Sequence, residues 1–273
     1  LGSTLQDLRR FDEALQAHET ARTLFQQTGD THFEAMGWNN LGSTLQDLRR
    51  FDEALQAHET ARTLFQQTGD THFEATAWGN LGTTFQELRR YDEALHAHET
   101  ARTLYQQTGD TQGQANAWNN LGTTLQDLRR FDDAHDAHET ARTLYQQTGD
   151  THSEAMTWNN LGTAYRGLSR FEEAVAAGQQ AVEMLVATED WFRTGEAWGE
   201  LATTLTAAGA DPVQVRDAWN KSATAYTRAG ADQEAAASRT HTDSTLIVEE
   251  QLPAGTCPPS EEPSGGAGTG AGT

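Results

Sequence analysis

Cysteine and long apolar segments are almost absent from this sequence. Cysteine occurs once in the 273 residues, as Cys257, so neither disulfide bonds nor clustered thiolate ligands can organise the fold. No apolar run is long enough to span a bilayer, and no basic stretch followed by an apolar one opens the chain as a secretory signal would. We therefore expect a reducing, cytoplasmic setting.

Positive charge is also scarce. There are 19 Lys and Arg residues against 40 Asp and Glu residues, which gives a formal net charge of −21. This excess of negative charge repels the phosphates of nucleic acids and of anionic membranes, so we expect neither as a partner. Lys221 is the only lysine, and such a bias toward arginine is typical of GC-rich bacterial genomes.

What the sequence does contain is a repeat of 40 residues. The stretch from Trp38 to Asp70 has close copies that begin at Trp78, Trp118 and Trp158. A fixed period of about 20 to 50 residues is typical of solenoids and propellers rather than of a single globular core. The architecture is therefore expected to be a stack of similar units.

The period also sets the expected boundaries of the units. Residues 1–35 match residues 41–75 letter for letter, so the chain begins partway through a unit, as a fragment or an array with an uncovered N-terminal face would. Pro, Gly and Ser prevail at the C-terminus, which is typical of disorder. The predicted divisions are a partial unit at 1–30, full units at 31–70, 71–110, 111–150 and 151–190, a degenerate unit at 191–230, a capping helix at 231–250 and a disordered tail at 251–273.

Each half of a unit has the apolar spacing of an amphipathic helix. Trp38, Leu41 and Leu45 share one helical face in the first half, and Ala54 and Leu55 belong to the stripe of the second half. A hairpin of two such helices buries both stripes only by stacking on the next hairpin. The predicted fold class is all-α, a right-handed α-solenoid of stacked antiparallel helical hairpins.

Recurring residues mark the expected helix ends and contacts. Thr31 and Glu34 have the spacing of a capping box at the start of a first helix. Gly42 and Ala54 are expected to face each other, since small side chains let the two helix axes approach closely. Second helices are expected to end at residues that can take a positive φ, namely Gly29, Gly69, Gly109 and Gly149.

The most strictly repeated residues resemble the tetratricopeptide repeat. Trp158, Leu161, Gly162 and Tyr165 match the pattern W-x-x-L-G-x-x-Y, and Ala174 stands at the alanine of the second helix. The resemblance implies a non-catalytic module for protein–protein interaction, in which the first helices line a concave groove.

The resemblance covers residues 1 to about 230, with two departures. The closing proline is replaced by Gln66, so the second helix can run on, which accounts for a longer period than the usual one of about 34 residues. Histidine replaces the consensus aromatic residue of the second helix at His18, His58, His98 and His138. Such long repeats resemble those of kinesin light chains, spindle-orienting adaptors and the sensor arrays of bacterial signal-transduction NTPases.

The resemblance implies that polar residues of the first helices form a peptide-binding surface. Side-chain amides both donate and accept hydrogen bonds, so an asparagine column can pair with the backbone of an extended peptide whatever its sequence. Acidic residues at one edge favour a neutral to basic peptide. The predicted binding residues are Asn39, Asn40, Ser43, Gln46, Asp47, Asn80, Thr83, Gln86, Glu87, Asn119, Asn120, Thr123, Gln126, Asp127, Asn159, Asn160, Thr163 and Arg166.

No motif in the sequence is typical of catalysis or of a cofactor site. His58 and Glu59 begin like the zinc motif H-E-x-x-H, but Arg62 replaces the second histidine. Histidines of successive units lie roughly 10 Å apart, too far to share one ion. His135 and His138 lie one turn apart and are the pair that could meet. We therefore predict no enzyme activity, no cofactor and no metal.

Three alternatives fit the same residues. The array could be the C-terminal sensor of a larger signal-transduction NTPase or transcription regulator. Near-identical units with an uncovered N-terminal face could instead stack end to end and self-associate. The polar column could also be solvated helix surface that duplication has copied.

Overall fold

The computed structural model describes residues 2–251, and within that range the chain forms helices and no strand. The predicted all-α fold class is confirmed. The helices are α1 (Gly2–Asp7), α2 (Phe11–Thr28), α3 (Thr31–Asp47), α4 (Phe51–Thr68), α5 (Thr71–Glu87), α6 (Tyr91–Thr108), α7 (Thr111–Asp127), α8 (Phe131–Thr148), α9 (Thr151–Gly167), α10 (Phe171–Ala187), α11 (Trp191–Ala207), α12 (Pro212–Arg228) and α13 (Asp232–Gln251).

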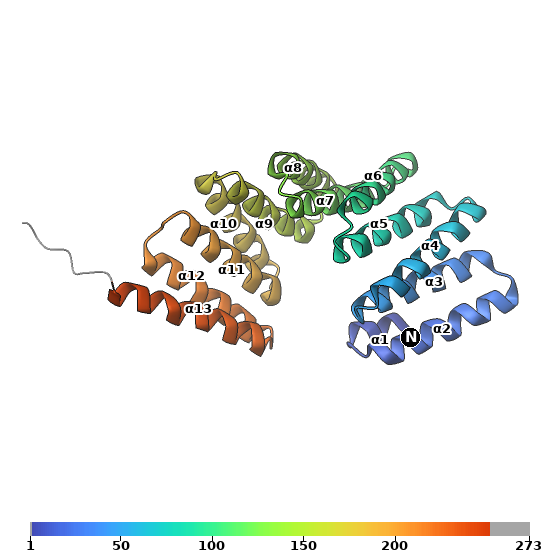
Figure 1. Ribbon diagram of the computed structural model, residues 1–273, viewed down its shortest axis with the longest axis horizontal. Helices are drawn as coiled ribbons and strands as arrows, with labels where there is room; N and C mark the ends of the chain where they lie inside the picture. The colour runs from blue at the N-terminus through green and yellow to red at the C-terminus, as the bar shows by residue number, and fades with distance from the viewer. Residues whose placement is uncertain (1, 252–273) are drawn as a thin grey trace, which may run out of the picture.

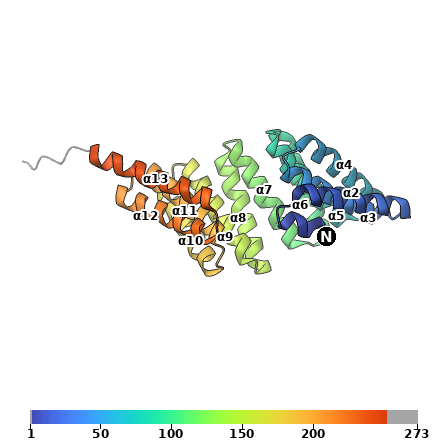
Figure 2. The same ribbon diagram turned by 90° about the horizontal axis from the view of Figure 1, so that it is seen from below.

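The helices form hairpins that stack into an arched solenoid (Figure 1). Each helix packs against its neighbours in sequence, and each of the first helices α3, α5, α7 and α9 also touches the next one. Helices α5, α7, α9 and α11 lie toward the inner side of the arch, and α6, α8, α10 and α12 lie toward its outer side. Figure 2 shows the same elongated array turned by 90°.

A tight turn joins the two helices of each hairpin. Arg49 takes a positive φ of 58°, and the Arg50 N–H donates to the Leu45 carbonyl at 2.8 Å. The guanidinium of Arg50 then pairs with Glu53, in the first turn of the second helix, at 2.7 Å. This pair is exposed, so it orients the helix start more than it stabilises the fold.

Glycines end the second helices as predicted, but the predicted capping box is wrong. The glycine at the end of α4, Gly69, has a φ of 71°. The first helix α3 begins at Thr31, so this threonine lies inside the helix and the preceding Asp30 is the cap. Asp30 Oδ1 accepts a hydrogen bond from the Phe33 N–H at 3.2 Å, and its negative charge complements the helix dipole.

A buried histidine column fills the interior of the hairpins. A Cβ atom on Gly42 would lie 2.5 Å from His58 Cε1, so the missing side chain of this glycine makes room for the imidazole ring. The same contact recurs between Gly82 and His98 and between Gly122 and His138. These three histidines are completely buried.

The hairpin of α9 and α10 shows the packing without the histidine ring. Gly178 stands at the histidine position, and a Cβ atom on Gly162 would meet the Ala174 carbonyl oxygen at 3.4 Å, an ordinary van der Waals distance. In this hairpin the glycine and the alanine of the repeat therefore approach each other closely, as the sequence predicts for this pair of positions.

Helix α13 packs against α12 at the C-terminal end of the described array. The predicted disordered tail at 251–273 lies outside the described residues, except for Gln251, with which α13 ends. No helix within residues 2–251 is both long and apolar enough to cross a membrane.

Candidate functional site

The predicted binding residues lie on α3, α5, α7 and α9, which form the surface that we call the inner face (Figure 1). Most of them are half-buried, and the exposed ones are Asp47, Thr83, Glu87 and Asp127. Their hydrogen bonds divide them into residues that link neighbouring units, residues that bond to their own helix, and residues that do neither.

One group of predicted residues links each first helix to the next. Gln46 Nε2 donates to Thr84 Oγ1 at 2.6 Å, and Arg166 Nη1 donates to Thr204 Oγ1 at 3.1 Å. The acceptor Thr84 is completely buried, and the sequence analysis did not single it out. At the other two junctions Gln86 Oε1 accepts from Thr124 Oγ1 at 3.3 Å, and Gln126 Nε2 donates to the Asn160 carbonyl oxygen at 2.7 Å.

Asparagine pairs form a second link between first helices. Asn80 Nδ2 donates to Asn39 Oδ1 at 3.0 Å, and Asn160 Nδ2 donates to Asn119 Oδ1 at 3.0 Å, each across a separation of 41 residues. These four amides therefore link neighbouring repeats, whereas the sequence analysis predicted that all of them contact a peptide.

Two amides of the same column are not used in this way. Asn40 and Asn120 are half-buried, and their side chains form no hydrogen bond with any other residue in the described part of the chain. Asn120 lacks a partner because Gly79 replaces the asparagine that would accept its hydrogen bond. Both side chains keep a free donor and a free acceptor.

The hydroxyl groups of the inner face bond mainly to their own helices. Ser43, Thr83 and Thr123 each donate to the carbonyl oxygen four residues earlier. Thr163 lies at the equivalent position of α9.

The acidic residues of the inner face lie at the ends of the first helices. Asp47 accepts a hydrogen bond from Gln6 at 2.5 Å, and Asp127 accepts one from Gln86 at 2.7 Å. Glu87 occupies the same position on α5.

The junction between α9 and α11 is built differently. Asn159 Oδ1 is buried, and no donor among the described residues reaches it. A cavity of about 500 Å³ lies beside it, between α9, α11 and α12, and sequence analysis did not predict it. The cavity is lined by Met156, Asn159, Asn160, Glu196, Gly199, Glu200, Thr203, Trp219 and Tyr226.

Burial keeps the histidine column uncharged. It lowers the pKa of His58 and of His98 to about 4 and that of His138 to about 3, because a charged ring would lose its hydration. The His58 ring lies 3.1 Å from Asn39 Oδ1 and 3.3 Å from Gln46 Oε1, whereas the other two rings have no hydrogen-bond partner within residues 2–251. These histidines are therefore packing residues beneath the inner face.

Comparison with known proteins agrees with this architecture. The sequence model of the tetratricopeptide repeat family matches residues 33–107 and 113–185, which is more than half of the chain. The chain belongs to the tetratricopeptide repeat family. Tetratricopeptide repeat proteins are generally non-catalytic modules that bind other proteins. The resemblance that the sequence predicted is confirmed.

Solved structures share the tetratricopeptide repeat fold at low sequence identity. BtubC from P. vanneervenii is 18% identical with a TM-score of 0.57, over 95% of this chain and 98% of that chain. A Rap protein complexed with Competence and Sporulation Factor is 12% identical with a TM-score of 0.66, over 92% of this chain and 74% of that chain. A signal transduction ATPase with a tetratricopeptide repeat sensor from Pyrococcus horikoshii is 12% identical with a TM-score of 0.68, over 89% of this chain and 42% of that chain. The search of curated proteins gave no match.

The outer side of the tetratricopeptide repeat array has grooves between successive second helices. A cavity of about 400 Å³ lies over Trp78, and one of about 330 Å³ lies over Trp118. The guanidinium carbon of Arg62 lies 5.0 Å from the centre of the Trp78 ring, and that of Arg102 lies 4.9 Å from the centre of the Trp118 ring. These cation–π contacts cover the tryptophans that the repeat pattern requires.

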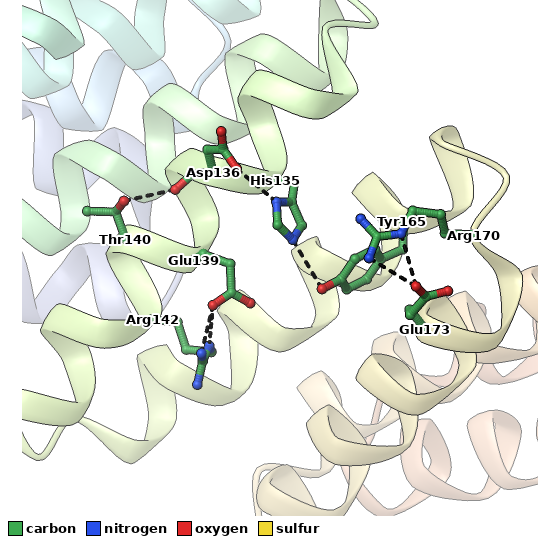
Figure 3. Close-up of polar contacts among 8 residues, drawn as sticks. All are labelled: His135, Asp136, Glu139, Thr140, Arg142, Tyr165, Arg170 and Glu173. Atoms are coloured by element: carbon green, nitrogen blue, oxygen red, sulfur yellow. Dashed lines mark hydrogen bonds and ion pairs between the residues drawn. The ribbon is translucent and has the colours of Figure 1, made fainter.

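A polar pair replaces an apolar one between α8 and α9 (Figure 3). His135 Nε2 lies 3.1 Å from Tyr165 Oη, and His135 Nδ1 lies 3.0 Å from Asp136 Oδ1, whereas earlier repeats hold apolar residues at both the His135 and Tyr165 positions. His138 is buried inside its hairpin, so the two histidines do not share one site. Within residues 2–251 no group of three or more histidine, cysteine or acidic residues is placed to hold a metal ion.

Proposed function

We propose that this array binds an extended, neutral to basic peptide segment of a partner protein along its inner face. The unused amides of Asn40 and Asn120 carry this proposal, on a face where most neighbouring amides are engaged in links between repeats. A half-buried amide with a free donor and a free acceptor can pair with both groups of a peptide unit. The two asparagines are two repeats apart, on the order of 20 Å, which an extended peptide spans in about six residues.

The charge of the inner face supports the expected peptide chemistry. Asp47, Glu87 and Asp127 are exposed at the ends of three successive first helices, and the whole chain carries a formal net charge of −21. The one basic residue among the predicted binding residues, Arg166, is paired with Glu200 at 2.9 Å. An acidic face attracts neutral to basic segments and repels acidic ones.

The likeness to known folds gives further support. A Rap protein of the same fold has been solved with Competence and Sporulation Factor, so a solenoid of this kind can carry a ligand. The ligand of that protein is its own, and the peptide proposed here rests on the amides of this chain.

A selection from a random peptide library followed by fluorescence anisotropy tests the proposal. The Asn40→Ala/Asn120→Ala variant should bind the selected peptide on the order of thirtyfold more weakly, because it loses two amide pairs worth about 1 kcal/mol each. The matched Asn80→Ala/Asn160→Ala variant should lose thermal stability and bind more nearly like the unchanged array. Equal affinity of both variants and the parent would refute the proposal.

A sensor role within a larger regulator is the second candidate. The ATPase from P. horikoshii, whose description names a tetratricopeptide repeat sensor, favours it, and this chain spans 42% of that protein. A nucleotide-binding domain encoded upstream in the same gene would support this role. Light scattering at increasing protein concentration would separate self-assembly from both.

A further inference from the structure

The junction between α9 and α11 lacks a link that closes two other junctions, the one between α3 and α5 and the one between α7 and α9. At those junctions an asparagine side chain donates to an asparagine 41 residues earlier, in the pairs Asn80 to Asn39 and Asn160 to Asn119. The same spacing from Asn159 leads to Glu200, whose carboxylate has no hydrogen to donate. Asn159 Oδ1 is therefore left buried without a donor. A buried acceptor of this kind is unfavourable unless something else supplies the hydrogen.

Other departures from the repeat gather around the same oxygen. Glu196 stands where the preceding repeats have methionine, threonine or asparagine, and Gly199 stands where α9 has Asn159 and where α5 also has a glycine, Gly79. A Cβ atom on Gly199 would lie 3.4 Å from Trp219 Cζ3, so the missing side chain leaves space beside the indole ring. The result is the cavity of about 500 Å³, which we call the α9–α11 cavity.

The charged groups of this cavity are acceptors. Glu196 gives one carboxylate oxygen to Arg193 at 2.6 Å, and Glu200 gives one to Arg166 at 2.9 Å. The second oxygen of each carboxylate is not engaged by another described residue, and none of the nine lining residues is basic. Together with Asn159 Oδ1, they provide three acceptors around one space.

Aromatic rings form the rest of the wall. Trp219 and Tyr226 line the cavity, and the Trp219 ring stacks on His241 with 4.3 Å between ring centres, which holds it in place. A guanidinium is planar, carries five N–H donors and no acceptor, and stacks well on aromatic rings. A guanidinium group therefore fits a cavity that has hydrogen-bond acceptors on one side and an aromatic wall on the other.

We infer that the α9–α11 cavity binds the guanidinium group of an arginine side chain on the peptide that occupies the inner face. The inference rests on the proposed function, because the arginine belongs to the peptide proposed there. It adds that the C-terminal repeats select an arginine residue in that peptide. Glu196 and Glu200 hold the charge, Asn159 accepts an N–H, and Trp219 packs against the plane of the group.

The first test uses N-acetyl-arginine amide with no peptide attached. It is titrated into the full chain with ¹⁵N-labelled tryptophan, and the indole resonance of Trp219, assigned with Trp219→Phe, is followed by NMR. The resonance should shift with the arginine amide and stay in place with N-acetyl-citrulline amide, a neutral analogue of the same shape. A shift of equal size with citrulline would overturn the inference. Tighter binding of spermidine than of the arginine amide would overturn the arginine assignment in favour of a free polyamine.

Variants that restore the repeat sequence provide the second test. Glu200→Asn supplies the amide that closes the α3–α5 and α7–α9 junctions, and Gly199→Asn fills the cavity with the side chain found in α9. Both should keep the helical circular dichroism and lose the response of Trp219. Glu173→Gln removes a carboxylate that is paired with Arg170 outside the cavity, and this control should respond like the parent. An unchanged response in Glu200→Asn would overturn the inference.

The inference and the proposed function can fail separately. A selected peptide that contains arginine should bind on the order of tenfold more tightly than its citrulline counterpart, and Glu200→Asn should remove that difference. If peptides bind through Asn40 and Asn120 but the difference is absent, the cavity assignment is wrong and the proposed function stands. If the arginine amide binds the cavity and no peptide depends on these asparagines, the proposed function is wrong.

Discussion

Two neighbouring junctions of this array occupy equivalent places and are closed in different ways. Between α7 and α9, Asn160 Nδ2 donates to Asn119 Oδ1 at 3.0 Å, and Gln126 Nε2 donates to the Asn160 carbonyl oxygen at 2.7 Å. Between α9 and α11, Glu200 takes the donor's place, and the junction contains a cavity. In an array of copies, a specific site can therefore arise where a repeat does not supply the link that closes the junction before it.

The same contrast extends to the interior of the repeats. The second helices α4, α6 and α8 each bury an uncharged histidine against a glycine, whereas α10 has Gly178 and α12 has Trp219 at that position. The regular half is thus held by a titratable column that the diverged half lacks. Perturbations that act on this column should separate the two halves.

Acidification should have the largest effect. Folded His58, His98 and His138 have pKa values of about 4, about 4 and about 3, below the unfolded value of about 6.5. The unfolded chain therefore binds more protons below pH 6.5. The stability from each ring is complete above about pH 6.5 and is lost as the pH falls toward the folded pKa, on the order of 3 kcal/mol per ring.

Hydrogen exchange at pH 7 and pH 4.5 measures this effect. After correction for intrinsic exchange rates, α4, α6 and α8 should lose more protection than α10 and α12, because repeat arrays open locally. His96 is exposed, so His96→Gln should leave the pattern unchanged. Equal loss of protection in both halves would contradict the role of the buried column.

Alanine at the repeat glycine should have the next largest effect. In Gly82→Ala the new Cβ atom would lie 2.5 Å from His98 Cε1, so the free energy of unfolding should fall by about 1–3 kcal/mol. In Gly162→Ala the nearest atom to the new Cβ atom, the Ala174 carbonyl oxygen, would be 3.4 Å away. The higher helix propensity of alanine should therefore raise the free energy of unfolding by about 0.5–1 kcal/mol. Urea unfolding measures both, and equal losses would show that histidine packing does not set the need for glycine.

Alanine variants of a hydrogen-bonded asparagine and of an unpaired asparagine should differ in stability by a smaller amount. Asn160→Ala leaves the half-buried acceptor of the pair, Asn119 Oδ1, without its donor, so it should be about 1 kcal/mol less stable than Asn120→Ala. Both changes remove an amide from the same position of a first helix, so propensity effects cancel. Thermal unfolding of the two variants side by side is the measurement. Identical midpoints would mean that the asparagine pairs contribute nothing to the junctions.

Restoring the asparagine link should have the smallest effect on stability. In Glu200→Asn the new amide can donate to Asn159 Oδ1, and the partly exposed pair with Arg166 is lost. The gain and the loss are each about 1 kcal/mol or less, so urea unfolding should show a change within about 1 kcal/mol of zero. A large loss of stability would show that Glu200 is a structural residue and not an open position.

The fold was predictable because its signals are local and repeated. Apolar spacing within one unit identifies both helices, and the 40-residue period identifies the stack. The helix cap was missed by one position because Asp30 and Thr31 are adjacent and both residue types can cap. The first helices that carry the candidate site were predicted from the family resemblance.

The sequence did not predict which polar residues of the inner face link neighbouring repeats and which have no partner. The bond from Gln46 to Thr84 spans 38 residues, and the pattern of one helix does not show whether its polar side chains reach the next repeat. The α9–α11 cavity depends on a donor that Glu200 fails to supply. The sequence signal was available as the departure of this repeat from its neighbours, but its meaning required the pairing of Asn160 with Asn119.

Photo-cross-linking of a selected peptide tests the central claim, that the ligand lies on the inner face. The photoreactive residue p-benzoylphenylalanine would replace Thr83, exposed on α5, or His96, exposed on α6 and lining the outer cavity over Trp78. We predict that the peptide is cross-linked from position 83 and not from position 96. Cross-linking from position 96 alone would contradict the account and place the ligand in the outer grooves.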